Sequence, residues 1–202
     1  MRVALSTIVT LTALLLHPVV VEGHTSEADT SAAYEKLGLQ VGATYNVNRN
    51  RLHDAWSPGV GPELTVTVPF YLGYAEAVAG YHIYDALPGA DVPDFQALMI
   101  QAGWGLQWEA TDRLAFSSGI RVGNYGMGFD TNGDLERAEV NESELIVALQ
   151  SSAAVRLSEQ IQVVATGSYQ RTYTRIRMNL VYASVGIRYQ IDTPSWLRSF
   201  LR

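Results

Sequence analysis

The last strand-like stretch of the chain, 179–191, alternates two kinds of side chain with a period of two. Every second residue from position 181 onwards is Val, Ala, Ile or Tyr, whereas the positions between them include Ser184, Gly186 and Arg188. Successive side chains of a β-strand point to opposite faces of the sheet. A strand here therefore has an apolar face that points outward and a mixed, mostly polar face that points inward, which is the reverse of a strand in a soluble protein.

Seven further segments alternate in the same way. They are 37–47, 63–72, 74–85, 95–109, 114–125, 143–157 and 161–170. About ten residues suffice for a tilted strand to cross a bilayer. The connections alternate between long polar loops and short turns, which is the asymmetry of transmembrane β-barrels. The pattern predicts an all-β fold, an eight-stranded antiparallel up-and-down transmembrane β-barrel over 37–191.

A soluble eight-stranded barrel of the lipocalin kind alternates equally well and is the rival fold. The outward positions of the strands carry almost no charge, and the glycines fall mostly on the polar face, where they leave room inside a narrow barrel. Outward aromatic residues lie near the strand ends, as two interfacial girdles require. They are Tyr45, Tyr81 and Tyr169 at the loop side and Phe70, Trp108, Phe116 and Tyr189 at the turn side. These features favour the membrane barrel.

The end of the 179–191 stretch resembles the C-terminal signal by which outer-membrane β-barrel proteins are recognised for assembly. The residues that carry this resemblance are Ser184, Gly186, Tyr189 and Ile191. Together with the alternating pattern, they make the chain similar to the small eight-stranded OmpA/OmpX-type outer-membrane barrels over essentially all of 37–191. The resemblance implies a monomer in the outer membrane of a Gram-negative bacterium, inserted by the barrel-assembly machinery and in contact with outer-membrane lipid and lipopolysaccharide. Such folds host porin-like, adhesive, structural and enzymatic members, so the fold does not settle function.

The two ends of the chain are predicted to lie outside the barrel. Residues 1–23 have the features of a cleaved signal peptide, namely Arg2, an apolar run over 3–16 and small residues before the cleavage position. A non-cleaved anchor is the alternative, but the apolar run is short for a transmembrane helix. Residues 24–36 are predicted to be a periplasmic lead-in. Residues 192–202 are predicted to be a short periplasmic tail that forms an interfacial helix or a frayed end.

Composition excludes several kinds of chemistry. The chain of 202 residues has no Cys, and so no disulfide, thiol nucleophile or thiolate metal site. Its net charge of −6 argues against a nucleic-acid partner. The hydrophobic content of 48% is that of an ordinary soluble enzyme, but a membrane barrel averages to a similar value because its strands alternate. No cofactor is predicted.

Seven titratable residues are assigned to the inward face of the barrel. They are Glu76, His82, Glu109, Arg121, Glu144, Arg156 and Arg188. Charges in a narrow lumen need partners, and an Arg fork that meets a carboxylate is the least costly arrangement. Because side chains fill the interior of an eight-stranded barrel, we predict a static plug of salt bridges and water. A gated conduit or a proton path is the alternative.

A basic cluster stands at the last outer hairpin. It consists of Arg171, Arg175 and Arg177. These residues are placed to contact lipopolysaccharide phosphates at the outer rim or to pair with the acidic third loop, 126–142. The sequence does not decide between the two.

The third loop contains a partial calcium-loop pattern. Residues 130–134 reproduce its first, third and fifth positions, but the sixth position is Leu135 and the twelfth is Asn141. A weak cation site completed by Glu136 or Glu142 is the alternative. We predict a solvated turn and no metal site.

Some eight-stranded barrels remodel lipid A, so an enzyme has to be weighed. Deacylases of this kind carry His-x-Ser on a strand, but neither His53 nor His82 is followed by Ser two residues on, and His24 precedes the first strand. For an acyltransferase, His53 with Asp54 beside it is a candidate base, yet no matching Asp-Ser pair occurs in the loops. We predict no catalytic residue and a structural, adhesive or surface-interaction role.

Overall fold

The computed structural model describes residues 36–70, 73–130, 141–173 and 178–195. Eight long strands account for most of them. They are β1 (Lys36–Asn46), β3 (Gly61–Phe70), β4 (Gly73–Ala86), β5 (Phe95–Thr111), β6 (Leu114–Phe129), β7 (Asn141–Arg156), β8 (Ile161–Thr172) and β9 (Asn179–Asp192). A short strand β2 (Trp56–Pro58) and a 3-10 helix η2 (Arg51–Asp54) lie between β1 and β3.

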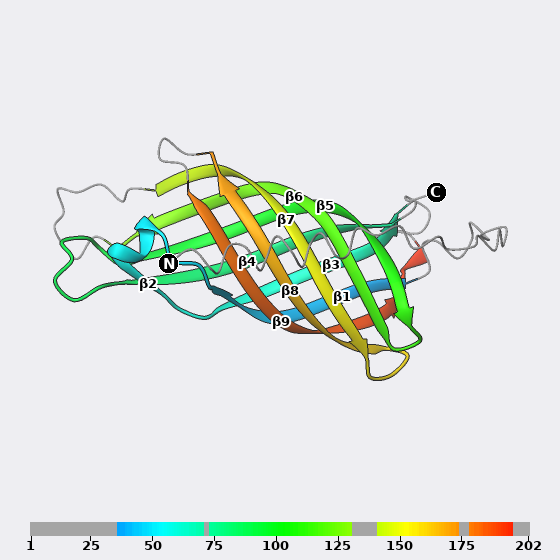
Figure 1. Cartoon of the computed structure of the whole chain (residues 1–202). Helices are drawn as coiled ribbons and strands as arrows, with labels where there is room; N and C mark the ends of the chain where they lie inside the picture. Colours follow the sequence, from blue (N-terminus) through cyan, green and yellow to red (C-terminus); the bar gives the residue numbers. More distant parts are fainter. Residues whose placement is uncertain (1–35, 71–72, 131–140, 174–177, 196–202) are drawn as a thin grey trace, which may run out of the picture. The chain divides into compact units, whose positions relative to one another are not determined.

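The long strands form a closed antiparallel barrel, shown in Figure 1. Each one pairs with the next along the chain, and β9 pairs with β1 from Lys36↔Asp192 to Asn46↔Tyr182, so the sheet has no free edge. The predicted eight-stranded up-and-down barrel is therefore confirmed. We call the end with the short connections 71–72, 112–113 and 157–160 the turn end, and the opposite end the loop end.

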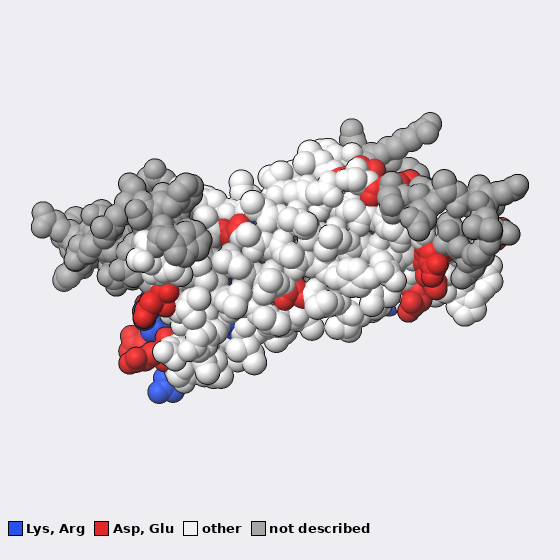
Figure 2. All heavy atoms as spheres, turned by 180° about the vertical axis from the view of Figure 1, so that it is seen from behind, with Lys and Arg blue, Asp and Glu red and all other residues white. Residues whose placement is uncertain are grey.

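Apolar side chains cover the outside of the barrel wall. Val41, Ile100, Leu149, Val185 and Ile187 are each more than half exposed, between 57% and 61%. Such a belt would be costly in water and suits the hydrocarbon core of a bilayer. Figure 2 shows that charged residues gather mainly at the two ends of the barrel and that the surface between them is mostly uncharged. No helix in the described part of the chain is long and apolar enough to cross a membrane.

The first long loop differs from the prediction. We expected residues 48–62 to form an exposed loop, but β2 pairs with the end of β4, from Trp56↔Ala86 to Pro58↔Tyr84. The indole Nε1 of Trp56 donates a hydrogen bond of 2.8 Å to the carbonyl oxygen of Pro93, and its ring meets Phe95 edge-on at 5.4 Å. The loop folds because its isolated apolar side chains, Leu52 and Trp56, pack partly buried against the end of the barrel. Period-two alternation does not detect such isolated residues.

Several strands extend beyond their predicted ends at the loop end. The predicted strand 114–125 continues to Phe129 as β6, and the predicted strand 161–170 continues to Thr172 as β8. Arg171, expected in the hairpin, therefore lies within β8. The added residues lengthen these strands at the loop end of the barrel. Their inward side chains add to the interior there.

Candidate functional site

A buried ion pair lies in the interior nearer the turn end. Arg121 on β6 donates from Nε to Glu76 Oε1 and from a guanidinium nitrogen to Glu76 Oε2, both at 2.9 Å. Gln150 on β7 donates from Nε2 to the same Glu76 Oε1 and to the hydroxyl of Tyr74. The side chains of Arg121 and Glu76 are only 4% and 2% exposed. The pair is bidentate and fully inside the barrel.

A glycine makes this pair possible. Glu76 and Arg121 lie on β4 and β6, which are separated by β5, and Gly103 of β5 stands between them in register with both. A Cβ at Gly103 would lie 2.8 Å from Arg121 Cγ and 3.1 Å from Glu76 Oε1. Because position 103 has no side chain, the two charged groups can meet across the intervening strand.

The structure joins one further pair of the predicted lumen residues. Arg156 and Glu109 form an ion pair of 3.2 Å at the turn end, but their side chains are 40% and 58% exposed, so solvent screens the pair. Arg188 donates to the amide oxygen of Gln40 at 3.0 Å, which is a neutral partner. Glu144 makes no ion pair with any described residue.

His82 points into an aromatic group at the loop end. Its ring centroid lies 4.5 Å from that of Tyr182 and 6.0 Å from that of Tyr125, and it is 2% exposed. The hydroxyl of Tyr182 lies 2.9 Å from that of Tyr84 and 3.3 Å from that of Tyr125. His82 thus belongs to a cluster of rings from β4, β6 and β9, and not to the ionic group around Glu76.

The interior at the loop end holds a cluster of apolar and aromatic side chains beside buried polar ones such as Asn46, Gln170 and Thr172. Buried residues of four strands form one cluster there. They are Val78, Tyr84, Phe95, Ala97, Met99, Tyr125, Met127 and Ile146. Leu52 of η2 and Trp56 of β2 pack against this cluster, together with Phe129 and Met178. We call the cluster the aromatic plug; the folded first loop covers it.

Sequence reasoning also missed a second buried carboxylate. Glu63 on β3 is 7% exposed and accepts a hydrogen bond of 3.1 Å from the hydroxyl of Ser184 on β9. The strand between them, β1, presents Gly42 in register with Glu63. Glu63 was assigned to the start of a strand, where a solvated rim position is the usual expectation. Glu63 falls on the same alternate, inward-facing positions as Thr65 and Thr67, and this pattern would have placed it inside the barrel.

A cavity of about 700 Å³ opens at the turn end of the interior. The residues that line it include Lys36, Glu109, Arg156 and Arg188, together with Tyr74. The ion pair between Arg121 and Glu76 lies deeper in the barrel, since Tyr74 accepts from the same Gln150 that contacts Glu76. We call this space the vestibule.

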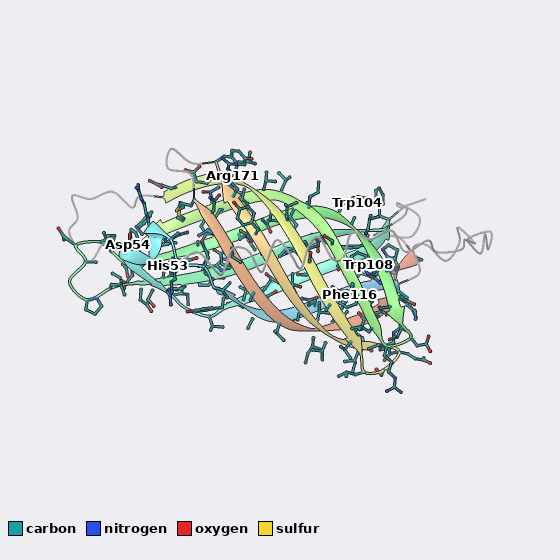
Figure 3. The ribbon with its side chains drawn as sticks, in the orientation of Figure 1. His53, Asp54, Trp104, Trp108, Phe116 and Arg171 are labelled. Carbon is teal, nitrogen blue, oxygen red and sulfur yellow. The ribbon has the colours of Figure 1, made fainter. Side chains whose placement is uncertain are left out.

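The candidate catalytic histidine is part of a helix cap. Figure 3 shows His53 and Asp54 together at the loop end. The backbone N–H of Asn50 donates to His53 Nδ1 at 3.2 Å, and Asn50 Oδ1 lies 3.1 Å from the same nitrogen. In a catalytic triad this nitrogen contacts the carboxylate that orients the ring, whereas here Asn50 takes that place. Partial burial and the Arg49 guanidinium hold the pKa of His53 below its usual value, while Asp54 opposes them. The first two effects favour the neutral imidazole.

Part of the predicted surface clusters lies outside the described residues. Arg171 is exposed at the loop end of β8, and its guanidinium carbon lies 5.8 Å from the ring centroid of Tyr173. Arg175 and Arg177 lie outside the described residues, as do 131–140 of the calcium-like loop, the predicted signal peptide 1–23 and residues 196–202 of the predicted tail. Among the described residues, no three acidic, histidine or cysteine side chains are grouped to hold a metal ion.

The residues of the predicted assembly signal lie on the strand that closes the barrel. Ser184 and Gly186 of β9 face inward and are buried, whereas Tyr189 and Ile191 face outward. The Tyr189 hydroxyl donates to Gln160 Oε1 at 3.0 Å at the turn end. The outward ring near the turns is where an interfacial aromatic residue is expected. Trp108 and Phe116 stack there at 6.3 Å on the neighbouring strands β5 and β6 (Figure 3).

Comparisons with known proteins support the fold. No protein-family model matches the sequence, and no curated protein sequence matches it. Among solved structures, the chain is similar to the outer membrane protein OprG of Pseudomonas aeruginosa, with 12% identity, a TM-score of 0.58, and coverage of 80% of this chain and 98% of OprG. Neisserial surface protein A gives 11% identity, a TM-score of 0.54, and coverage of 78% and 97%.

Ail, the attachment invasion locus protein of Yersinia pestis, is also similar, with 11% identity, a TM-score of 0.51, and coverage of 78% of this chain and 99% of Ail. Ail has been crystallised in complex with the heparin analogue sucrose octasulfate. At these identities the likeness concerns the fold alone. Its closed ring of eight strands, its apolar outer belt and these neighbours show that the chain has the fold of the small eight-stranded outer-membrane β-barrels.

Proposed function

We propose that the protein is a non-enzymatic outer-membrane barrel that is closed to solutes and presents its loop end for interactions at the cell surface. The aromatic plug is the observation that carries this proposal. Tyr84, Tyr125 and Phe95 are each at most 2% exposed and come from three strands. Side chains packed at the density of a protein core leave no continuous path for a hydrated solute.

The polar groups near the turn end support the same proposal. Glu76, Arg121 and Gln150 bridge β4, β6 and β7 across the interior. Moving this bridge aside would separate a buried bidentate ion pair, which is costly. The interior is thus obstructed twice, by an ionic bridge and by the aromatic plug, so a rigid scaffold is favoured over a conduit.

Purified protein in planar lipid bilayers is expected to give no large, stable conductance. The variant Y84A/Y125A/Y182A/R121A serves as the matched comparison. It removes two rings of the aromatic plug, the Tyr182 ring whose hydroxyl contacts both of them, and the cation of the ionic bridge. It should conduct if it inserts as a folded barrel, and heat-dependent gel mobility reports that folding. Stable currents from the wild-type monomer would contradict a closed interior.

The geometry around His53 argues against an acyltransferase or deacylase. A general base needs an available ring nitrogen and a group that orients the ring. Here Nδ1 faces Asn50, Nε2 is buried away from solvent, and Asn50 rather than the Asp54 carboxylate is the partner of the ring. We expect mass spectrometry to find the same lipid A species in a deletion strain as in its parent. A lost or altered acyl chain would instead assign an enzymatic role.

The outer rim offers a surface for anionic groups. Arg171 is exposed beside Tyr173, and the similarly folded Ail binds a polysulfated sugar in its crystal structure. We infer that Arg171, with Arg175 and Arg177, contacts lipopolysaccharide phosphates. The test is binding of the R171Q variant to lipopolysaccharide-containing vesicles. Binding equal to that of the wild type would argue against this contact. A monomeric state and insertion by the barrel-assembly machinery stay predictions.

A further inference from the structure

The vestibule contains a cation without a carboxylate partner among the described residues. Arg188 on β9 lines this cavity, and one of its terminal nitrogens donates to the neutral Gln40 Oε1 at 3.0 Å. Its Nε is buried and makes no hydrogen bond within the part of the chain that the structure describes. A guanidinium in such a place retains unused donor capacity.

The buried carboxylates nearby are already engaged. Both oxygens of Glu76 accept from Arg121, and one of them also accepts from Gln150. Glu63 accepts from the hydroxyl of Ser184. Neither forms an ion pair with Arg188, so the charge of this guanidinium is not compensated by direct contact.

The other cations of the vestibule each have a carboxylate nearby, in an ion pair or on the neighbouring strand. Arg156 is bound to Glu109 at 3.2 Å. Lys36 at the rim stands in register with Asp192 on the neighbouring strand. Arg188 is therefore the cation inside the vestibule that has no carboxylate in contact among the described residues. A partly buried cation of this kind favours an anion beside it.

The size and lining of the vestibule suit a small ligand. Its volume of about 700 Å³ falls in the usual range of ligand pockets. Thr67, Tyr74 and Ser117 supply hydroxyl groups to its wall. We propose that the vestibule binds a small soluble organic anion, with a carboxylate or phosphate group against Arg188, from the periplasmic side.

Thermal unfolding of the purified protein in zwitterionic detergent tests this proposal with citrate and inorganic phosphate as probes. At constant ionic strength, either anion should raise the unfolding temperature of the wild type, and an equal concentration of neutral glycerol serves as the reference. The R188Q variant should lose this dependence on anion concentration, whereas R51Q, an exposed arginine of η2 at the opposite end, should keep it. An equal rise in R188Q, or no rise in the folded wild type, would overturn the proposal.

A second measurement covers the case in which R188Q does not fold. Because the chain has no Cys, the S117C variant carries a single thiol inside the vestibule, and S143C carries one at the loop end. Citrate should slow the reaction of a neutral maleimide with S117C several-fold and leave S143C unchanged. Absence of protection would refute the site. Protection by phosphatidylglycerol in mixed micelles, but not by citrate, would assign it to a lipid headgroup and overturn the soluble-anion proposal.

Discussion

Replacing Arg121 with Ala is expected to lower the free energy of unfolding by about 3 kcal/mol. The substitution leaves Glu76, whose side chain is 2% exposed, with Gln150 and no cation in contact. Neutralising the stranded carboxylate should recover part of the loss, so the double variant R121A/E76Q is expected to be more stable than R121A. Equilibrium unfolding in urea, followed by Trp fluorescence in phospholipid vesicles, measures all three proteins.

Arg156 provides the matched control for this experiment. It was assigned to the same inward network, but its ion pair with Glu109 is exposed to solvent. The R156A variant should therefore lose well under about 1 kcal/mol, which is typical of surface ion pairs. Equal losses in R121A and R156A would mean that water screens the interior pair as fully as the rim pair.

The barrel could be predicted because its outer surface and its interior differ in polarity at most positions. Outward Val41 and inward Gln40 show this contrast, and it recurs along β1, β3, β8 and β9. The partners inside could not be predicted in the same way. Glu76 and Arg121 were both assigned to the inward face, yet only the register through Gly103 brings them together.

The aromatic plug escaped prediction for a physical reason. In β5 the inward residues Phe95, Ala97 and Met99 alternate with the apolar outward residues Leu98 and Ile100, so the polarity contrast disappears. Where a strand is apolar on both faces, as over 97–100 of β5, the period-two contrast is lost.

Other residues of the plug lie at strand ends, and a loop residue packs against it. Tyr125 and Met127 lie where the predicted strand ended, although β6 continues to Phe129. Trp56 stood in a segment without periodicity. The alternation of residues along a strand does not show how side chains from strand ends and loops pack together.

Placing a lysine in the middle of the outer belt is expected to be as damaging as breaking the buried ion pair. Val41 is 61% exposed and stands in register with the apolar outward residues Leu64 and Ile187 on its two neighbouring strands. A charged side chain at the bilayer midplane costs a barrel about 2–4 kcal/mol. The V41K variant should therefore unfold at a markedly lower urea concentration in phospholipid vesicles.

The same substitution at Val47 separates a membrane effect from a general effect of lysine. Val47 is also apolar and exposed, at 48%, but it follows the end of β1, beyond the outward ring of Tyr45 at the loop end. Near the interface a lysine costs only about 0–1 kcal/mol, because its ammonium group reaches water. A large loss for V41K and a small one for V47K would place the edge of the hydrocarbon between these two residues. Equal losses would show that the exposed belt is not in contact with lipid, since only a bilayer makes the cost of a charge depend on depth along one strand.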